Sequence, residues 1–256
     1  MKGSAQEKKP SLLLWRAFGV AAIPLLWWAM TDIVGVSGRY LPSITAVAYA
    51  WQRVSPPIWT HAFFTASRLS VGFVLGTALG IGLALVMARS PASEAALIPS
   101  IQSLRAIPAA ATVPFFLLWF GFSEGGRYAL VLLAVAFNVA VAAGQILTRH
   151  SSAHECLFKS LGLKAGHLTF RYCLPRILED ILPTLRYSMA LAIGAVTVSE
   201  LLGSQVGLGY LIQTSRLTFS LDLLFLAMIV LGALSAAFDL LLKVLWGVII
   251  FWRRPQ

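Results

Sequence analysis

Long apolar stretches, separated by short polar segments, make up most of the chain. An α-helix needs about 20 mostly apolar residues to cross the hydrocarbon layer of a bilayer, and six stretches reach or approach this length. The third is the shortest and contains Pro108 and Pro114, which a bundle tolerates because neighbouring helices satisfy the freed backbone groups. The pattern predicts an all-α integral membrane protein with about six transmembrane helices, at Leu14–Val36, Ala66–Ala88, Ile107–Phe122, Tyr128–Leu147, Leu185–Gly203 and Leu223–Trp252.

The composition agrees with a membrane protein. Hydrophobic residues make up 58% of the chain and charged residues 12%, whereas a soluble domain carries about 25% charged residues. The net charge of +10 would favour a nucleic-acid partner in a soluble protein. In a membrane protein, basic residues hold loops on the cytoplasmic side. We therefore expect the lipid bilayer, and no nucleic acid, among the partners.

The distribution of Lys and Arg orients the predicted spans. Six spans place both termini on one side, and the segments on that side contain twelve Lys and Arg against four on the other. Cytoplasmic loops carry the excess of positive charge, so we expect a multi-pass protein of the inner membrane with both termini in the cytoplasm. The expected cytoplasmic segments are 1–11, 88–96, 148–186 and 252–256, and the external ones are 37–62, 121–127 and 204–221.

The N-terminal segment reads as a short cytoplasmic tail, residues 1–11, followed by the membrane domain, residues 12–256. The apolar run Leu12–Met30 is longer than the hydrophobic core of a signal peptide and lacks a small-residue cleavage site. We expect it to be retained as the first span.

Cysteine and histidine give no sign of a metal site, a cofactor or a disulfide. Cys156 and Cys173 both fall in an expected cytoplasmic segment, where disulfides rarely persist. His150, His154 and His167 have no recognisable ligand spacing relative to these cysteines.

Two expected external segments are more than simple loops. Leu41–Ser43 precedes a stretch, residues 44–54, that suits a helix lying along the membrane interface. The segment Gly203–Ser220 contains the sequence GLGY at Gly207–Tyr210 and is too apolar for a free loop. We expect it to fold back against the bundle, where protein rather than lipid covers its backbone.

Glycines at intervals of four mark a packing face on the second predicted span. Gly72, Gly76 and Gly80 lie on one side of a helix, where the missing side chains allow another helix to approach closely. The partner helix belongs either to the same chain or to a second copy.

The longest polar stretch, residues 148–186, predicts two short helices beneath the membrane. Leu157 and Leu161 have helical spacing and precede Gly162, and glycine commonly ends a helix. Pro175 suits the first turn of the next helix because its φ angle is already set. An elbow with an exposed apolar face fits a groove on a partner protein.

This loop resembles the EAA loop of binding-protein-dependent ABC permeases. The similarity rests on Gly162 followed, after a fixed interval, by Leu174-Pro175. Further motifs from about residue 40 to the C-terminus look like the nitrate, sulfonate and taurine branch of the family. These motifs are Leu41–Ser43, Ser67–Leu85, Ser103–Gly121, Ser199–Gly203 and Gly207–Ile212.

The resemblance implies a type I importer permease whose cytoplasmic coupling helix docks on a separate ATPase. Where the family has a glutamate, this chain has Cys156, with Glu155 one place earlier and the bulky Leu157 and Phe158 following. Either the loop start is shifted by one residue or the contact is bulkier. The residues expected to couple to the ATPase are Glu155, Leu157, Phe158, Leu161, Gly162, Leu174 and Pro175. The implied partners are two ATPase subunits, a solute-binding protein and a second copy of the permease in a homodimer.

Several charges fall in or near the predicted spans. Asp239 and Lys243 are four residues apart, so they share a helix face and can neutralise each other. Glu200 needs hydrogen-bond donors from the glycine-rich segment or from an arginine. Its role is either to anchor the outer gate or to form part of the pathway. Arg68 and Arg105 are either ordinary boundary charges or a source of positive potential for an anionic solute. The expected outer-gate residues are Glu200, Gly207, Gly209 and Tyr210.

The sequence contains no Walker motif, catalytic triad or phosphate-binding loop, so the chain is not expected to be an enzyme. We expect a permease subunit that forms the pathway for a small solute, with anions such as sulfonates, taurine or nitrate favoured and neutral thiamine precursors also compatible with this branch. The alternative is a secondary transporter driven by an ion gradient, which would show inverted repeats and ionisable residues near the membrane centre. A membrane-embedded enzyme is a third possibility. The sequence argues against it, because it shows no cluster of polar catalytic groups.

Overall fold

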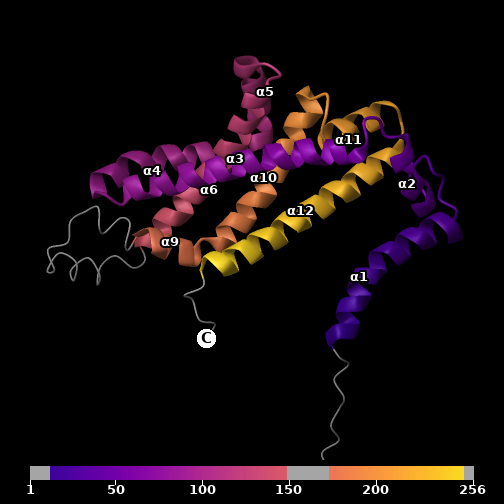
Figure 1. The fold of residues 1–256 in the computed structure, drawn as a ribbon, viewed down its shortest axis with the longest axis horizontal. Coiled ribbons are helices and arrows are strands. Elements are labelled where there is room, and N and C mark those ends of the chain that lie inside the picture. Colours follow the sequence, from indigo (N-terminus) through magenta and orange to yellow (C-terminus); the bar gives the residue numbers. More distant parts are fainter. Residues whose placement is uncertain (1–11, 149–172, 251–256) are drawn as a thin grey trace, which may run out of the picture.

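The computed structural model describes residues 12–148 and 173–250, and these form helices joined by short connections (Figure 1). The described segments contain no strand, in agreement with the expected all-α class. In chain order the helices are α1 (Leu12–Trp28), the π-helix η1 (Ala29–Ile33), α2 (Ile44–Ala50), the 3₁₀ helix η2 (Trp51–Arg53), α3 (Ile58–Met87), α4 (Pro91–Ala106), α5 (Ala109–Phe120), α6 (Glu124–Thr148), α9 (Leu174–Asp180), α10 (Leu182–Gly203), α11 (Leu208–Leu217) and α12 (Leu221–Ile249).

Four described helices are long and apolar enough to cross a membrane: α3, α6, α10 and α12. The pair α4 and α5 passes the same test together, as a span bent by 97°, which raises the number to five. The first predicted span is helical across α1 and η1, but its described apolar part, Ala21–Ile33, is shorter than a full crossing. The described residues thus contain four or five full-length spans, where the sequence predicted about six.

The third predicted span begins earlier than the sequence indicated. Apolar length alone placed it at Ile107–Phe122, whereas α5 is a 12-residue helix preceded by the 16-residue α4. Ser90 caps α4 by accepting a hydrogen bond from the Ser93 backbone N–H at 3.1 Å, and Pro91 occupies its first turn. Pro108 separates α4 from α5, because proline disfavours a helical conformation in the residue before it.

The centre of the bundle is the contact between α3 and α6. A Cβ atom added at Gly76 would lie 2.5 Å from the backbone oxygen of Leu132, and one at Gly80 would lie 2.6 Å from that of Ala136. At Gly72 the same atom would lie 2.5 Å from Cβ of Val131. All three glycines therefore face α6 of the same chain. The helices α3 and α6 lie so close together at these positions that a side chain on α3 would collide with α6.

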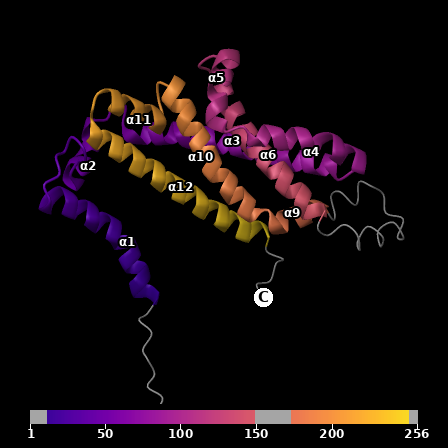
Figure 2. The same cartoon turned by 180° about the vertical axis from the view of Figure 1, so that it is seen from behind.

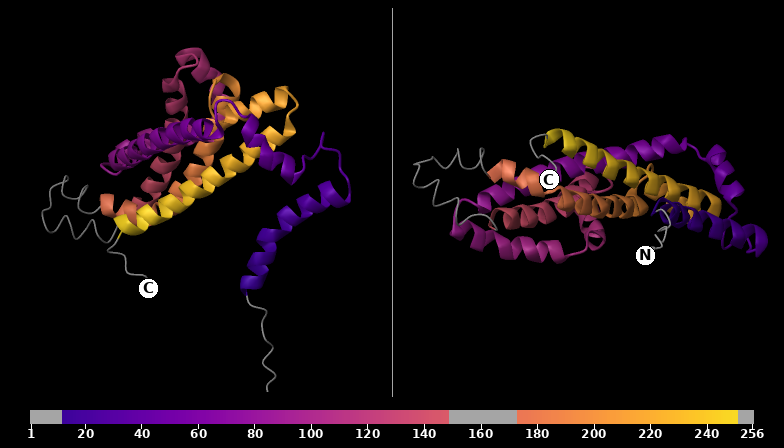
Figure 3. Two further views of the ribbon diagram at one scale, coloured as in Figure 1. Left: turned by 45° about the vertical axis from the view of Figure 1, so that its right-hand side comes forward. Right: turned by 90° about the horizontal axis from the view of Figure 1, so that it is seen from below.

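The helices α10 and α12 pack on each other and complete the bundle (Figure 2). The helix α11 folds back and packs on both α10 and α12, which confirms the expectation for Gly203–Ser220. By contrast, α1 extends away from the bundle (Figure 3). It is attached at its C-terminal end, where Trp27 donates a hydrogen bond to the Pro42 backbone oxygen at 2.9 Å and packs on the ring of Phe225.

The charges in α12 are paired. Lys243 Nζ lies 2.7 Å from Asp239 Oδ2, as the four-residue spacing predicted, and Arg186 Nε on α10 donates to Asp239 Oδ1 at 2.5 Å. Arg186 lies 53 residues from Asp239, and no sequence spacing predicts this contact. This ion-pair cluster fixes α10 to α12 near the ends that adjoin α9 and the C-terminus.

Candidate functional site

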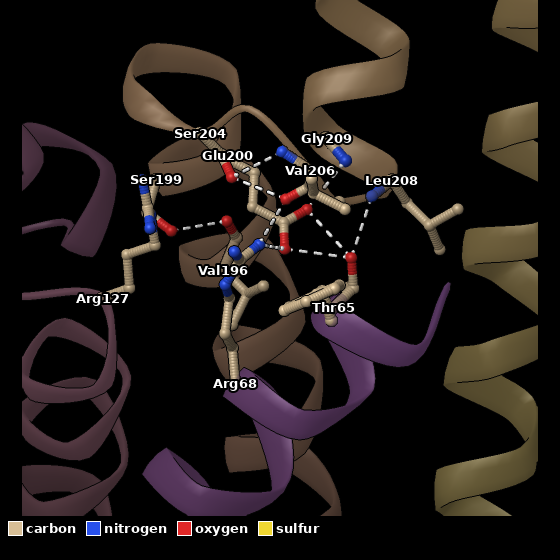
Figure 4. Close-up of polar contacts among 12 residues, drawn as sticks. Thr65, Arg68, Arg127, Val196, Ser199, Glu200, Ser204, Val206, Leu208 and Gly209 are labelled. Carbon is tan, nitrogen blue, oxygen red and sulfur yellow. Dashed lines mark hydrogen bonds and ion pairs between the residues drawn. The ribbon is translucent and has the colours of Figure 1, made fainter. Parts of the chain in front are cut away.

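Four charged side chains meet at the end of the bundle where α11 lies, and Figure 4 labels three of them, Arg68, Arg127 and Glu200. Arg68 comes from α3, Glu124 and Arg127 come from the first turn of α6, and Glu200 comes from the last turn of α10. Two guanidinium groups and two carboxylates balance in charge. We call these four residues the charge cluster.

Arg68 is the centre of the charge cluster, and only 2% of its surface is exposed. Its Nε and Nη2 atoms donate to the two oxygens of Glu124 at 2.7 and 2.6 Å, a bidentate arrangement. Its Nη1 atom donates to Glu200 Oε1 and to the backbone oxygen of Val206, both at 2.7 Å. One side chain thus joins α3 to α6, to α10 and to the segment leading into α11.

Glu200 is buried as completely as Arg68, with 1% of its surface exposed. Besides Arg68, it accepts hydrogen bonds from the Thr65 hydroxyl at 3.0 and 2.9 Å and from the Gly209 backbone N–H at 2.9 Å. A buried carboxylate is strongly unfavourable unless its oxygens are paired in this way. Both Glu200 oxygens have donors, which explains how the bundle accommodates the charge.

The same contacts hold the beginning of α11. The first backbone N–H groups of any helix lack partners within it. Here the Leu208 N–H donates to the Thr65 hydroxyl at 2.9 Å, and the Gly207 N–H donates to Nδ1 of His61 at 3.1 Å. The His61 ring stacks on Tyr210, with centroids 6.0 Å apart. The N-terminus of α11 is therefore attached to α3 as well as to α10.

The two glycines of the GLGY sequence leave room for the Glu200 side chain. A Cβ atom at Gly207 would lie 2.5 Å from Glu200 Oε2, and Gly207 has a φ of 142°, which side-chain-bearing residues rarely adopt. At Gly209 the Cβ would lie 2.5 Å from the Thr197 backbone oxygen and 2.8 Å from Glu200 Cβ. Any larger residue at either position would displace α11 from the carboxylate.

Arg127 completes the charge cluster. Its Nη1 atom donates to Glu124 at 2.7 Å, and its Nη2 atom donates to the backbone oxygen of Gly203 at the C-terminal end of α10. The Arg127 side chain is buried, whereas the Glu124 side chain retains 43% exposure. The interpretation of Arg127 as a charge in an external loop was wrong, because α6 begins at Glu124 rather than at Tyr128.

Sequence reasoning found part of this site. It singled out Glu200, Gly207, Gly209 and Tyr210, and the structure brings all four to one end of the bundle. It named Arg68 without a partner. It missed Glu124, Arg127, Thr65 and His61, for which the available signal was weak: each is a polar residue at or near the end of an apolar stretch.

Most of the expected ATPase-coupling residues, Glu155, Leu157, Phe158, Leu161 and Gly162, lie outside the described residues. Leu174 and Pro175 are described, and they form the first turn of α9, the position expected for that proline. In the described segments, no group of three or more His, Cys, Asp or Glu side chains is arranged to hold a metal ion.

Comparison with known proteins gives a consistent set of transport permeases. SsuC of Escherichia coli (strain K12), a permease named for aliphatic sulfonate transport, is 30% identical over 234 residues, covering 89% of this chain and 88% of the relative. The formylaminopyrimidine transport permease ThiX of Halalkalibacterium halodurans is 28% identical over 257 residues and the full length of both chains. The taurine transport system permease TauC of Escherichia coli (strain K12) is 23% identical over 233 residues, 88% of this chain and 85% of the relative.

The fold is similar to that of a solved transporter. A chain from inward-facing structures of the MetNI methionine ABC transporter superposes with a TM-score of 0.58 at 16% identity, covering 75% of this chain and 98% of the other. The model of the family described as "binding-protein-dependent transport system inner membrane component" matches residues 72–250. The chain belongs to this family of ABC importer permeases, as a multi-pass membrane protein of the type I fold.

Proposed function

We propose that two copies of this chain form the translocation pathway of an ATP-driven importer. Two separate ATPase subunits would bind on the cytoplasmic side, and a solute-binding protein would deliver a small solute of the sulfonate, taurine or nitrate kind on the outside. The observation that carries this proposal is the family match over residues 72–250. The names of the relatives support the class of solute.

The connectivity of α6 and α10 supports a mechanical link across the membrane. The expected coupling loop, residues 148–186, follows α6 directly and overlaps the beginning of α10. At their other ends the same helices carry Glu124 and Glu200, the carboxylates of the charge cluster. A 25-residue helix such as α6 spans about 37 Å. Each helix therefore joins one end of the coupling loop to the outer end of the bundle.

In this mechanism the charge cluster keeps α3, α6, α10 and α11 together as one unit. When ATP binding moves the two coupling loops towards each other, α6 and α10 would carry the displacement outward without losing it in local rearrangements. A packed interface changes position as a body rather than deforming gradually. The pathway between the two permease copies would then open on the outside, where the binding protein releases its solute.

The coupling loop provides the direct test. Leu161→Asp and Phe158→Asp each place a charge on the apolar face expected to dock on the ATPase, and an unpaired charge in an apolar contact costs several kcal/mol. We expect both variants to insert into the membrane but to lose copurification with the ATPase subunit in nanodiscs. Gly162→Pro should retain the ATPase and lose the stimulation of ATP hydrolysis by solute-loaded binding protein, because it distorts the elbow and leaves the contact face intact.

The matched control is Leu217→Asp. Leu217 is 66% exposed at the end of α11, in an expected external segment, and its substitution should leave copurification with the ATPase unchanged. Wild-type association and stimulation in all three coupling-loop variants would refute the coupling role of this loop.

A further inference from the structure

The described charged side chains of the four long spans are paired, whereas Arg105, in the bent pair α4 and α5, is not. Every charged side chain in α3, α6, α10 and α12 takes part in an ion pair. This is the expected behaviour, since ionisable groups within a membrane are costly and pair with one another or face water. Arg105, in the last turn of α4, makes no ion pair with any described residue. The paired residues are Arg68, Glu124, Arg127, Arg186, Glu200, Asp222, Asp239 and Lys243.

The position of Arg105 makes its unpaired charge informative. It lies just before the break at which the span formed by α4 and α5 bends by 97°. Arg105 thus lies next to the irregular backbone that joins these two helices. Within a membrane, irregular backbone is tolerated where it lines a water-filled cavity.

Arg105 lines a cavity of about 1210 Å³ between α4, α5, α6 and α10. It is the one charged residue in the lining of this cavity, as far as the described residues define it. Neutral polar side chains from all four helices surround the same space, and aromatic residues such as Phe115 and Phe116 line the remainder. The polar side chains include Gln102, Thr112, Asn138, Thr184 and Tyr187.

We propose that this cavity is a solute site in the pathway and that Arg105 is its charge-selecting residue, which favours a compact organic oxyanion such as a sulfonate or carboxylate. A guanidinium group presents two parallel donors that match the oxygens of such an anion. The apolar part of the lining would accommodate a short aliphatic chain. The inference rests on the proposed transport function, and it excludes a neutral or cationic solute from favourable binding here.

A labelling experiment tests the charge of the cavity without transport. The full-length permease, assembled with its ATPase in nanodiscs, carries Thr112→Cys in the cavity, with Cys156 and Cys173 replaced by serine. The rate of modification is measured with anionic sulfonatoethyl methanethiosulfonate and with cationic trimethylammonioethyl methanethiosulfonate. A unit charge about 7 Å away in water changes the local concentration of each reagent by about threefold, in opposite directions, so Arg105→Gln should lower the anion-to-cation rate ratio by about tenfold.

Two controls make the result specific. Arg105→Lys keeps the positive charge and should keep the ratio. A cysteine at Gln205, next to the charge cluster and away from this cavity, should show a ratio that does not depend on residue 105. Ethanesulfonate should slow the modification of Thr112→Cys when Arg105 is present, whereas the neutral dimethyl sulfone at the same concentration should not.

The outcomes separate this inference from the proposed function. Because labelling requires no ATP hydrolysis, the cavity can show anion selectivity even if the coupling-loop variants behave like wild type. A rate ratio that Arg105→Gln leaves unchanged would show that Arg105 is an ordinary boundary charge. Equal protection by ethanesulfonate and dimethyl sulfone would likewise overturn the proposal.

Discussion

Replacing Glu200 by glutamine tests whether the charge cluster holds the bundle together. The substitution keeps the shape of the side chain and removes its charge. One oxygen of Glu200 faces Arg68 Nη1 at 2.7 Å, and the other faces the Gly209 N–H at 2.9 Å. In Glu200→Gln the new amide NH₂ must therefore meet one of these donors, whichever way it turns.

The magnitude follows from burial. Removing one partner of a buried ion pair costs about 3–5 kcal/mol, because a buried charge is left uncompensated, and Glu200→Gln leaves the charge cluster with two guanidinium groups and one carboxylate. For a chain of this size about 1 kcal/mol shifts the melting midpoint by about 2–4 °C, so Glu200→Gln should melt about 6–20 °C below wild type. Glu124→Gln is the matched control, since Glu124 binds the same Arg68 but retains 43% exposure. Solvent screening at the part-exposed Glu124 should make its effect smaller than that of Glu200→Gln, even though its partners Arg68 and Arg127 are buried.

The measurement is thermal unfolding of the purified permease in nanodiscs, followed by tryptophan fluorescence and paired with ATPase rates. We expect Glu200→Gln to retain the ATPase subunit, to lower transport, and to make basal hydrolysis less dependent on the binding protein, because α11 loses its attachment to α10. A melting midpoint equal to that of wild type, or a loss no larger than that of Glu124→Gln, would refute the reasoning.

Two further predictions concern packing and topology. Gly76→Ala should lower stability by about 1–3 kcal/mol through overpacking, since its Cβ would lie 2.5 Å from the Leu132 backbone oxygen. The control Gly82→Ala should be neutral or stabilising, because a Cβ at Gly82 meets nothing within 4 Å. Equal melting midpoints for the two variants would contradict the α3–α6 contact. Reporters fused after Gln256 or within residues 150–170 should report the cytoplasm, and a fusion at Gln205 the outside. An external signal from residues 150–170 would overturn both the orientation and the coupling role.

The features that could be predicted from the sequence depend on residues that lie close together in the chain, within one helix or one segment. Apolar length located α3, α6, α10 and α12, because the requirement to span hydrocarbon applies to each segment by itself. The pairing of Asp239 with Lys243 followed from their four-residue spacing, which places both on one helix face. The apolar character of Gly203–Ser220 likewise predicted that α11 packs on the bundle.

The tertiary structure alone decided which helices meet and what each charge faces. Arg68 binds Glu124 and Glu200, which are 56 and 132 residues away, and no sequence spacing encodes such a pairing. Pro108 marks the break between α4 and α5 in the sequence, whereas the 97° bend was not predictable, because hydropathy measures length and not direction. Arg105 and Arg68 are indistinguishable as isolated arginines in apolar sequence. Only the packing of separate helices gives Arg68 two carboxylates and leaves Arg105 facing a cavity.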